Sequence, residues 1–540
     1  MTAMDFTAQL DRLNLAPAVK AALEQAVQAQ LAALQEQAKR DAERLKAKDL
    51  KIQALTLELA QLRRLRYGAK SEALSQVHWD LFEETWNTDL AAVEAEVEQV
   101  ADAPSGPTGA QRPRRRAGRQ PLPAHLPRIE HRHEPDSCQC EQCGRDLVQI
   151  GEDITEQLDV EPAKFFVHRH LRPQYACRAC ETITAAPIPP AVIDGGLAAV
   201  GLLVWVLTAK FLDHLPLYRL EQIAARDQVS LSRSTLADWV GRLGVALQPL
   251  ADRLAEHLKR RLTRHADETP VPQLDPGRGK TKKAYLWAYR SNDLEPGPPI
   301  IVFDYQPGRA GEHAKNFLDG WHGHLMVDDY GGYKHLFAPT REGAPPCTEG
   351  GCLAHARRKF FDLYQAHRSP LAQEALQRIG RLYDIERQAK DCSIAERKKL
   401  RHELALPELA AWHQWLLQTR ARTAPGGASA KALDYTLRRW AALSRYAETG
   451  HLPIDNNVIE NSIRPIALGK KNWLFAGSER AGKRAAAIQS LLGTARLNGL
   501  DPAAWLRDTL EKLPTHPNSR IDELLPFPTA DIEQQPEQTG

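Results

Sequence analysis

Apolar residues recur at alternating three- and four-residue steps from Val27 to Leu65. This is the spacing of the a and d positions of a coiled coil, and it lasts for about five heptads. The positions that fit it are Val27, Leu31, Leu34, Ala38, Leu45, Ile52, Leu55, Leu59 and Leu62. We therefore predict an N-terminal helical region over residues 1–100, whose coiled coil joins copies of the chain into a homo-oligomer. The alternative is a long amphipathic helix that packs against its own chain.

A second apolar stretch runs from Leu197 to Leu212. It is shorter than the roughly 20 residues that span a bilayer, and it contains Lys210 and is interrupted by Gly201. The stretch therefore predicts a buried helix, and we expect no contact with a membrane.

Two short helical patterns separated by a polar turn follow, over Tyr218–Asp227 and Ser234–Leu243. Ser232 or Ser234 is suited to cap the second helix. The arrangement predicts a helix-turn-helix within a helical DNA-binding region over residues 191–260. The side chains expected to face a DNA groove are Arg233, Ser234, Thr235 and Arg242. Plain helix packing is the alternative, because the same geometry is common without DNA.

From residue 261 the pattern changes to short runs typical of β-strands. These runs are Thr263–Asp267, Ala284–Tyr289, Ile300–Tyr305 and Leu325–Val327, with a helical stretch over Gly311–Asp319 before the last. Three strands, a helix and a further strand are the layout of a ribonuclease-H-like fold, which we predict for residues 261–500. Helical, charged sequence over about 366–450 predicts a helical insertion in this core, and residues 501–540 form a C-terminal tail.

Length and composition make the chain an ordinary multidomain α+β protein. Its 540 residues are too many for one compact core, and its 43% hydrophobic and 26% charged content is unremarkable. The net charge of +3 indicates no particular partner, so any nucleic-acid signal must be local. One such signal is the linker predicted over residues 101–127, which is rich in Pro, Gly and Arg. Its cluster Arg114, Arg115 and Arg116 is a candidate phosphate contact, although charge runs are often merely solvated.

Paired cysteines define a zinc-binding module over residues 128–190. Cys140 with Cys143 and Cys177 with Cys180 form two Cys-x-x-Cys half-sites, the spacing of tetrahedral zinc. Cys138 is an alternative to Cys140. Short strands around residues 158–160 and 165–167 are expected between the two half-sites. The eight cysteines lie behind no secretory signal, which fits a reducing cytoplasm better than a disulfide framework.

Three carboxylates stand in distinctive strings: Asp267 in His-Ala-Asp-Glu-Thr-Pro, Asp328 in Val-Asp-Asp-Tyr-Gly-Gly-Tyr, and Glu460 in Asp-Asn-Asn-Val-Ile-Glu-Asn-Ser. Three acids brought together by a fold can hold two divalent ions, which is a common means of breaking and joining phosphodiester bonds. Asp267 is expected on the first strand, Asp328 at the end of the fourth and Glu460 early in a helix.

Neighbouring acids leave alternatives for this site. Asp329 competes with Asp328, although Asp328 directly ends the apolar run 325–327. Glu268 and Asp455 are near enough in sequence to support or replace a ligand. Arg464, Lys470 and Lys471 follow the helix of Glu460 and are candidate phosphate contacts.

These acidic strings occur together with Cys352-Leu-Ala-His355-Ala-Arg-Arg-Lys, Ile463-Arg-Pro, Leu468-Gly-Lys-Lys-Asn-Trp-Leu-Phe-Ala-Gly-Ser and Arg520-Ile-Asp-Glu-Leu-Leu-Pro. In these motifs, and over nearly its whole length, the chain resembles the DDE transposases of the insertion-sequence 66 family. The resemblance implies a ribonuclease-H-like core in which Asp267, Asp328 and Glu460 bind Mg2+ or Mn2+ and carry out catalysis.

The resemblance also implies an activity and partners. The chain is expected to cut the ends of a mobile DNA element and join them to target DNA, in the cytoplasm of a bacterium and on the nucleoid when bound. Small accessory proteins of the same element are expected partners. Cys352 and His355 resemble a Cys-x-x-His signature of several transposase families and are expected to position the core or the DNA; a plain helix start is the alternative.

Two other functions compete with this one. The chain could be a DNA-binding regulator derived from a transposase, in which the carboxylates are relics. It could also be a ribonuclease-H-like nuclease that hydrolyses nucleic acid without joining ends. The intact acidic strings argue against the first.

Overall fold

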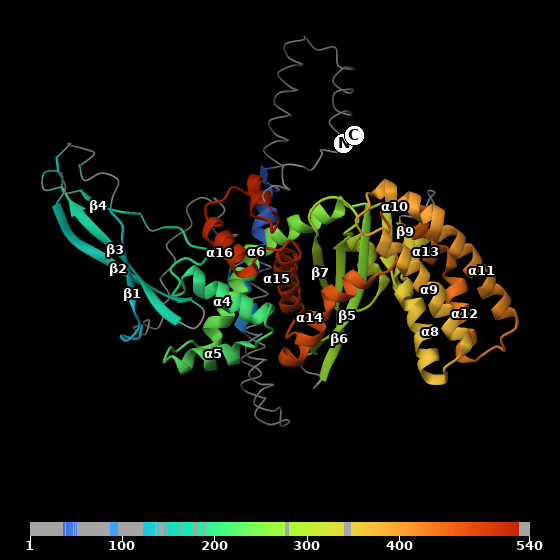
Figure 1. Ribbon diagram of the computed structural model, residues 1–540. Coiled ribbons are helices and arrows are strands. Elements are labelled where there is room, and N and C mark those ends of the chain that lie inside the picture. The colour runs from blue at the N-terminus through green and yellow to red at the C-terminus, as the bar shows by residue number, and fades with distance from the viewer. Residues whose placement is uncertain are drawn as a thin grey trace, which may run out of the picture. The chain divides into compact units, whose positions relative to one another are not determined.

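The computed structural model describes residues 122–528 with short gaps, the longest at 135–144 (except 139), 276–279 and 340–346, and parts of 36–50 and 87–95 (Figure 1). Most of the predicted coiled coil and linker lies outside these residues, as do Arg114, Arg115 and Arg116. The chain divides into two compact units, residues 1–73 with 90–117, and residues 74–89 with 118–540. All elements described below belong to the second unit.

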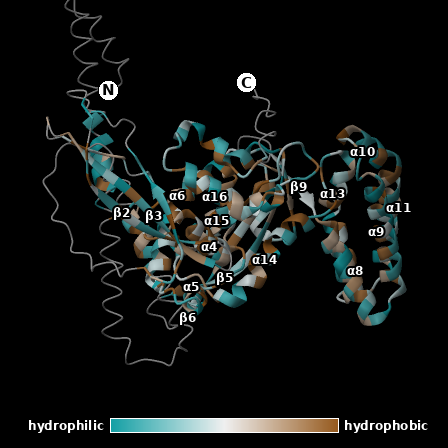
Figure 2. Cartoon of the chain, turned by 60° about the vertical axis from the view of Figure 1, so that its left-hand side comes forward, coloured by the Kyte–Doolittle hydropathy of each residue, from teal (hydrophilic) through white to brown (hydrophobic). Residues whose placement is uncertain are grey.

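A small sheet forms the region predicted to bind zinc. Its strands are β1 (Arg128–Arg132), β2 (Val148–Glu161), β3 (Lys164–Ala176) and β4 (Ile183–Ala185). β3 pairs in parallel with β1 and antiparallel with β2 and β4. The predicted strands around 158–160 and 165–167 are the ends of the long β2–β3 hairpin, most of which is hydrophilic (Figure 2). Leu158 and Val167, which are apolar and buried, join these ends to the helical region that follows.

Three helices follow, α4 (Val200–Phe211), α5 (Leu217–Arg226) and α6 (Arg233–Lys259). α4 is buried, as predicted, and Gly201 permits its close approach to β2, because a Cβ there would overlap the carboxylate of Asp159. No helix among the described residues is long and apolar enough to cross a membrane. Ser232 caps α6 by accepting a hydrogen bond from the Thr235 amide at 3.2 Å.

The second helix of the helix-turn-helix was predicted over residues 234–243, and this range is too short. α6 continues to Lys259 because its apolar spacing continues through leucines at 247, 250, 254 and 258, all of them buried. These leucines belong to the large core that α4, α6 and α15 (Glu479–Leu497) share. α16 (Pro502–Lys512) and the 3-10 helix η5 (Asn518–Leu524) pack against α4 and α6, respectively.

A five-stranded sheet lies at the centre. Its strands are β5 (Thr263–Asp275), β6 (Lys280–Ser291), β7 (Ile301–Gln306), β8 (Gly323–Val327) and β9 (Cys347–Gly351), and their order is β7-β6-β5-β8-β9. β6 is antiparallel to β5 and β7, whereas β5, β8 and β9 are parallel. All four predicted strands are present. α7 (Gly311–Phe317) and the 3-10 helix η2 (Gly331–Phe337) follow β7 and β8.

β5 and β6 extend well beyond the predicted strands, as a hairpin that continues past Asp267. Pro270 and Pro272 are compatible with this strand because β8 pairs with β5 only as far as His265. Beyond that point the outer edge of β5 carries no strand ladder, so the missing amide hydrogens of the prolines break no pairing. The carbonyl of Pro272 on this edge accepts a hydrogen bond from Ala476 at 2.8 Å.

α14 (Asn457–Trp473) and α15 lie along one face of the sheet (Figure 1). Apolar residues of both helices pack on alternate residues of β5, β6 and β7, such as Val271, Leu286 and Phe303. The same face therefore receives Asp267, which is four residues before Val271 on the strand.

Between β9 and α14 lies a helical insertion with its own core. Its elements are α8 (Leu353–His367), α9 (Pro370–Gln388), α10 (Ile394–Leu400), a π-helical turn (Arg401–Ala405), α11 (Leu406–Ala421), α12 (Ala428–Arg438), α13 (Trp440–Ser444) and η4 (Arg445–Glu448). Trp412, which is fully buried, lies in this core. The insertion begins with α8, earlier than the predicted residue 366, and it contains the helix pair α10 and α11, which the sequence patterns did not single out.

Candidate active site

Asp267 and Asp328 lie side by side where the adjacent parallel strands β5 and β8 stop pairing, Asp267 within β5 and Asp328 directly after β8. In the pairing of β5 with β8, His265 is opposite Met326. Each aspartate is two residues beyond that pair, so the register places them at the same level, and adjacent strands are about 4.8 Å apart. Residues two apart share a sheet face, so both carboxylates lie on the face of His265 and Met326.

Asn456 fastens the start of the helix that carries Glu460 to the same part of β5. Its side-chain oxygen is 2.7 Å from Nδ1 of His265, and its amide nitrogen donates to the carbonyl of Ala266 at 3.0 Å. Its backbone N–H donates to the sulfur of Cys352 at 3.2 Å. Asn456 immediately precedes α14, and Glu460 lies in the first turn of that helix. The start of the helix is thus fastened directly beside the residues that precede Asp267.

Other carboxylates act electrostatically on Asp267. The pKa of Asp267 is raised to about 7 by burial, by Glu268, and by the charges of Asp328 and Glu460. One Asp267 oxygen accepts the Glu268 amide at 2.8 Å, and among the described residues no cationic side chain forms an ion pair with this aspartate. A carboxylate among other carboxylates ionises readily only when a cation is supplied. The donor set therefore fits a divalent metal ion.

Asp329 is engaged elsewhere, which favours Asp328 as the ligand. Asp329 forms ion pairs with Lys334 at 3.0 Å, Arg438 at 2.9 Å and Arg439 at 3.5 Å. Burial acts in the opposite direction, but the hydrogen bond from Lys334 and the two arginines lower the pKa of Asp329. This carboxylate anchors the end of β8 to α12, whereas Asp328 acts electrostatically on Asp267.

Glu268 and Asp455 also have structural partners. Glu268 points to the opposite face, where its side chain is 1% exposed and bonds to Arg309 and, at 2.9 Å, to the Tyr333 hydroxyl. Asp455 accepts hydrogen bonds from the Tyr383 hydroxyl at 2.8 Å and the Asn457 amide at 3.1 Å. These contacts favour supporting roles for both acids over metal binding.

Cys352 and His355 adjoin Glu460, and their role in positioning the core or the DNA stays a prediction. Cys352 is 1% exposed and precedes α8, and His355 lies in the first turn of that helix. Nδ1 of His355 is 3.7 Å from a Glu460 oxygen, and ligand atoms of all three residues lie within 4.8 Å of one another.

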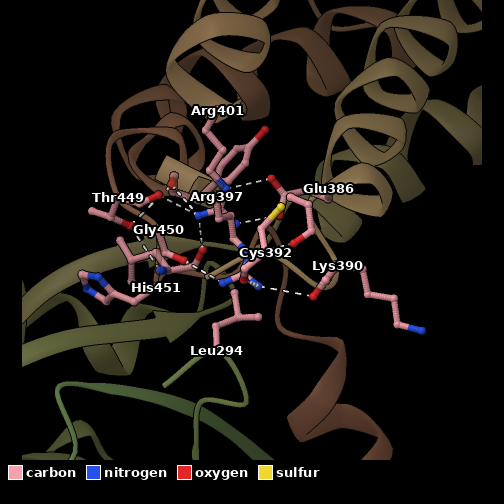
Figure 3. Close-up of polar contacts among 12 residues, drawn as sticks. Leu294, Glu386, Lys390, Cys392, Arg397, Arg401, Thr449, Gly450 and His451 are labelled. Atoms are coloured by element: carbon pink, nitrogen blue, oxygen red, sulfur yellow. Dashed lines mark hydrogen bonds and ion pairs between the residues drawn. The ribbon is translucent and has the colours of Figure 1, made fainter. Parts of the chain in front are cut away.

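Two buried arginines fasten the segment that leads into α14 (Figure 3). Arg401 is 0% exposed; it binds Glu386 through two hydrogen bonds, of 2.8 and 2.6 Å, and donates to the carbonyls of residues 446, 449 and 452 at 2.8–2.9 Å. Arg397 donates to the carbonyl of Gly450 at 3.1 Å and to those of residues 389, 390 and 392. We call Arg397, Arg401 and Glu386 the arginine clamp. Because α14 begins a few residues after 452, the clamp ties the insertion to the helix of Glu460.

A basic hollow lies along the free edge of β5. Its lysines come from β6 and from the last turn of α14, and they are Lys282, Lys283, Lys470 and Lys471. Lys470 donates to the carbonyl of Pro270 at 3.0 Å, and Lys471 is exposed. Arg464 is exposed on α14 one turn after Glu460. Lys282 and Lys283 were not predicted from the sequence, although the run Lys280-Thr-Lys-Lys next to a predicted strand was a usable signal.

The predicted DNA-contacting residues of the helix-turn-helix have partners within the chain. Arg233 forms an ion pair with Glu221 at 3.1 Å, and Arg242 one with Asp238 at 3.2 Å. Ser234 is exposed and Thr235 partly so, at the start of α6. Their contact with DNA stays a prediction.

In the zinc-binding region, Cys177 is 1% exposed directly after β3, and the other predicted ligands lie outside the described residues. The same sheet contains a histidine ladder that was not predicted from the sequence. His131 bonds to His168 at 2.7 Å and His133 to His170 at 3.0 Å, which cross-links β1 to β3. The repeated His-Arg-His at 131–133 and 168–170 was the available signal.

Comparison with known proteins decides the family. A model described as "Transposase IS66 family" matches residues 195–484, which include all three carboxylates. The chain belongs to this family. Further models match the "IS66 C-terminal element" at 490–527 and the "zinc-finger binding domain of transposase IS66" at 137–181. The last supports a structural zinc ion in this IS66-family chain. A model described as "Transposase C of IS166 homeodomain" matches 54–130, where the sequence predicted the end of the coiled coil and the linker.

Long relatives of this IS66-family chain occur in Sinorhizobium fredii. The uncharacterized protein y4jD is 36% identical over 91% of this chain and 97% of its own length. The uncharacterized protein y4qI is 37% identical over 89% of this chain and 90% of its own length. The family models together match most of the chain, and these relatives align with nearly all of it.

Proposed function

We propose that this chain is a DDE transposase that cleaves the ends of a mobile DNA element and joins them to target DNA, with Asp267, Asp328 and Glu460 holding two divalent ions. The observation that carries the proposal is the register of β5 with β8, which places the two aspartates side by side on the face that α14 covers. The sheet order β7-β6-β5-β8-β9, with only β6 antiparallel, supports a ribonuclease-H-like core.

The residues present fit Mg2+ or Mn2+, since both ions prefer carboxylate oxygens. Asp267, Asp328 and Glu460 are the ligands in this proposal. When bound, such ions lower the pKa of an attacking water or DNA 3′-hydroxyl and neutralise charge on the leaving oxygen.

The chain's own residues prepare this chemistry. Asn456 and the arginine clamp fix the position of Glu460, while the ion pairs of Asp329 fix the end of β8. Lys282, Lys283, Lys470 and Lys471 bind the phosphates of a DNA strand along the edge of β5 that continues from Asp267. Arg464, one turn beyond Glu460, contacts the same strand.

We propose the predicted domain division around this core. The coiled coil joins copies of the chain, while the zinc-binding module and the start of α6 contact DNA together with Arg114, Arg115 and Arg116. Small accessory proteins of the element are proposed partners.

A strand-transfer assay tests the proposal. The purified chain is incubated with Mg2+, labelled element-end DNA and a target plasmid, and Asp319→Asn, which changes an exposed aspartate shortly before β8, serves as the matched control for Asp328→Asn. We expect joined products from the wild type and the control, and none from the Asp328 variant. Nicks without joining would indicate a nuclease, and binding without cleavage a regulator.

A further inference from the structure

His355 lies beside Glu460, and the polar contact between their side chains is an ion pair only if the imidazole is protonated. Its Nδ1 atom is buried and has no hydrogen-bond partner among the described residues. The 3.7 Å to the Glu460 oxygen is too long for a hydrogen bond. Two ligand atoms at right angles around one Mg2+ or Mn2+ ion are about 3 Å apart, so an ion could bind both with a small adjustment.

The surroundings of His355 and Glu460 are consistent with a role as metal ligands. The side chains of His355 and Glu460 are 35% and 37% exposed, so solvent reaches both residues, while the Nδ1 atom itself is enclosed. Cys352, the third member of the cluster, is 1% exposed, and its sulfur already accepts the backbone N–H of Asn456. Cys352 therefore fixes the spacing of α8 and α14, which leaves His355 to face the ion.

We infer that His355 is a further ligand of the cation that Glu460 holds, and that its imidazole nitrogen gives this site a preference for Mn2+ over Mg2+. This rests on the proposed function, in which Glu460 is a metal ligand. Nitrogen donors suit Mn2+ better than Mg2+, which strongly prefers oxygen. Asp267 and Asp328 offer only oxygen, so the preference arises at the helix side of the site.

The test uses the full chain loaded with zinc, which is silent in electron paramagnetic resonance. Mn2+ is titrated into the wild type, and electron spin-echo modulation is recorded to detect nitrogen bound to manganese. We expect nitrogen modulation in the wild type and its loss in His355→Gln, with Mn2+ affinity reduced about tenfold and Mg2+ affinity, measured by competition, reduced much less.

Two further variants guard against a purely structural effect. His355→Glu restores a charged oxygen ligand, so it should bind Mg2+ at least as well as the wild type while it lacks nitrogen modulation. His367→Gln changes an exposed histidine on the same helix and should leave the modulation and both affinities unchanged.

The inference would be overturned by nitrogen modulation that is absent from the wild type or persists in His355→Gln, or by equal losses of Mn2+ and Mg2+ affinity. Asp267→Asn in the same titration separates this failure from that of the proposed function. If Asp267→Asn keeps full metal affinity and cleavage, the carboxylate site itself is wrong. If it loses both while His355→Gln binds like the wild type, only the role of His355 is wrong.

Discussion

The arginine clamp and the carboxylates around Asp267 are two enclosed clusters of charge. The clamp pairs opposite charges, whereas the carboxylates bring like charges together. In the clamp, Arg401 is fully buried, and Glu386 and three carbonyls satisfy its guanidinium. Asp267, in contrast, lies near further carboxylates. Burial and the charges of these neighbours raise the pKa of Asp267 to about 7. Like charges without a counter-ion destabilise the folded chain, whereas the paired clamp does not.

In the proposed function, this difference distinguishes charges that stabilise the fold from charges that bind a metal ion. The same distinction applies between neighbours: Asp329 has three cationic partners, and Asp328 faces Asp267. A charge that the protein leaves uncompensated at a cost in stability indicates a function, because selection for folding alone would neutralise it.

The largest expected effect follows from removing one uncompensated carboxylate. Asp267→Asn should reduce DNA cleavage by at least about a thousandfold, because it removes a metal ligand. In buffer without added Mg2+ it should raise the free energy of unfolding, because it relieves repulsion among the acids. Gel assays and denaturant unfolding measure the two effects. A variant that loses stability together with activity would contradict the contrast with the clamp.

Breaking the clamp should have the opposite signature. Arg401→Met leaves Glu386 and three carbonyls without their partner and should cost about 3–5 kcal/mol of unfolding free energy. Adding Glu386→Gln should recover part of this loss, because the unpaired charge disappears. Chemical denaturation of the single and double variants measures both values. A loss below about 1 kcal/mol would show that the clamp is not a stabilising element.

The sequence predicted the four strands that carry short apolar runs, as well as the order of the three acids along the chain. It could not predict β9, since Cys347–Gly351 contains two glycines and little β propensity, and the strand exists only because β8 offers an edge. The extension of β5 through Pro270 and Pro272 could not be predicted from the sequence either, because it depends on where β8 stops pairing with β5.

The choice between Asp328 and Asp329 likewise depends on distant residues. Arg438 and Arg439, which neutralise Asp329, lie about a hundred residues later in the insertion, where no local pattern connects them to it. The position of Glu460 could be suspected from Asp455-Asn-Asn, but its placement depends on contacts of Asn456 with β5 that only the fold creates.

The pH dependence of the free energy of unfolding tests whether the pKa of Asp267 is raised. The pKa of Asp267 is raised from its ordinary 3.8 to about 7, so the folded state holds a proton that the unfolded chain releases between these values. This contribution to stability is fully present below about pH 4 and is lost as the pH rises through 7. Without added Mg2+, the stability of the wild type relative to Asp267→Asn should therefore fall across this window. A constant difference between the two unfolding free energies would show that Asp267 is not perturbed.

The smallest expected effect concerns DNA contacts beside the acids. Lys282→Gln with Lys283→Gln should lower the slope of log affinity against log salt by about two, because two phosphate contacts are lost. Lys512→Gln, which changes an exposed lysine on α16, should leave the slope unchanged. Fluorescence anisotropy at several salt concentrations measures all three proteins. Equal slopes for the double variant and the wild type would remove the basic hollow from the DNA path.

The central claim is that three carboxylates far apart in sequence hold divalent ions at the point where β5 and β8 stop pairing. Crystals of the chain with element-end DNA, soaked in Mn2+, would show the ions by anomalous scattering. The account predicts anomalous density between Asp267, Asp328 and Glu460, with Asp329 still paired to its arginines. Manganese bound elsewhere, with these three carboxylates free of it, would contradict the account.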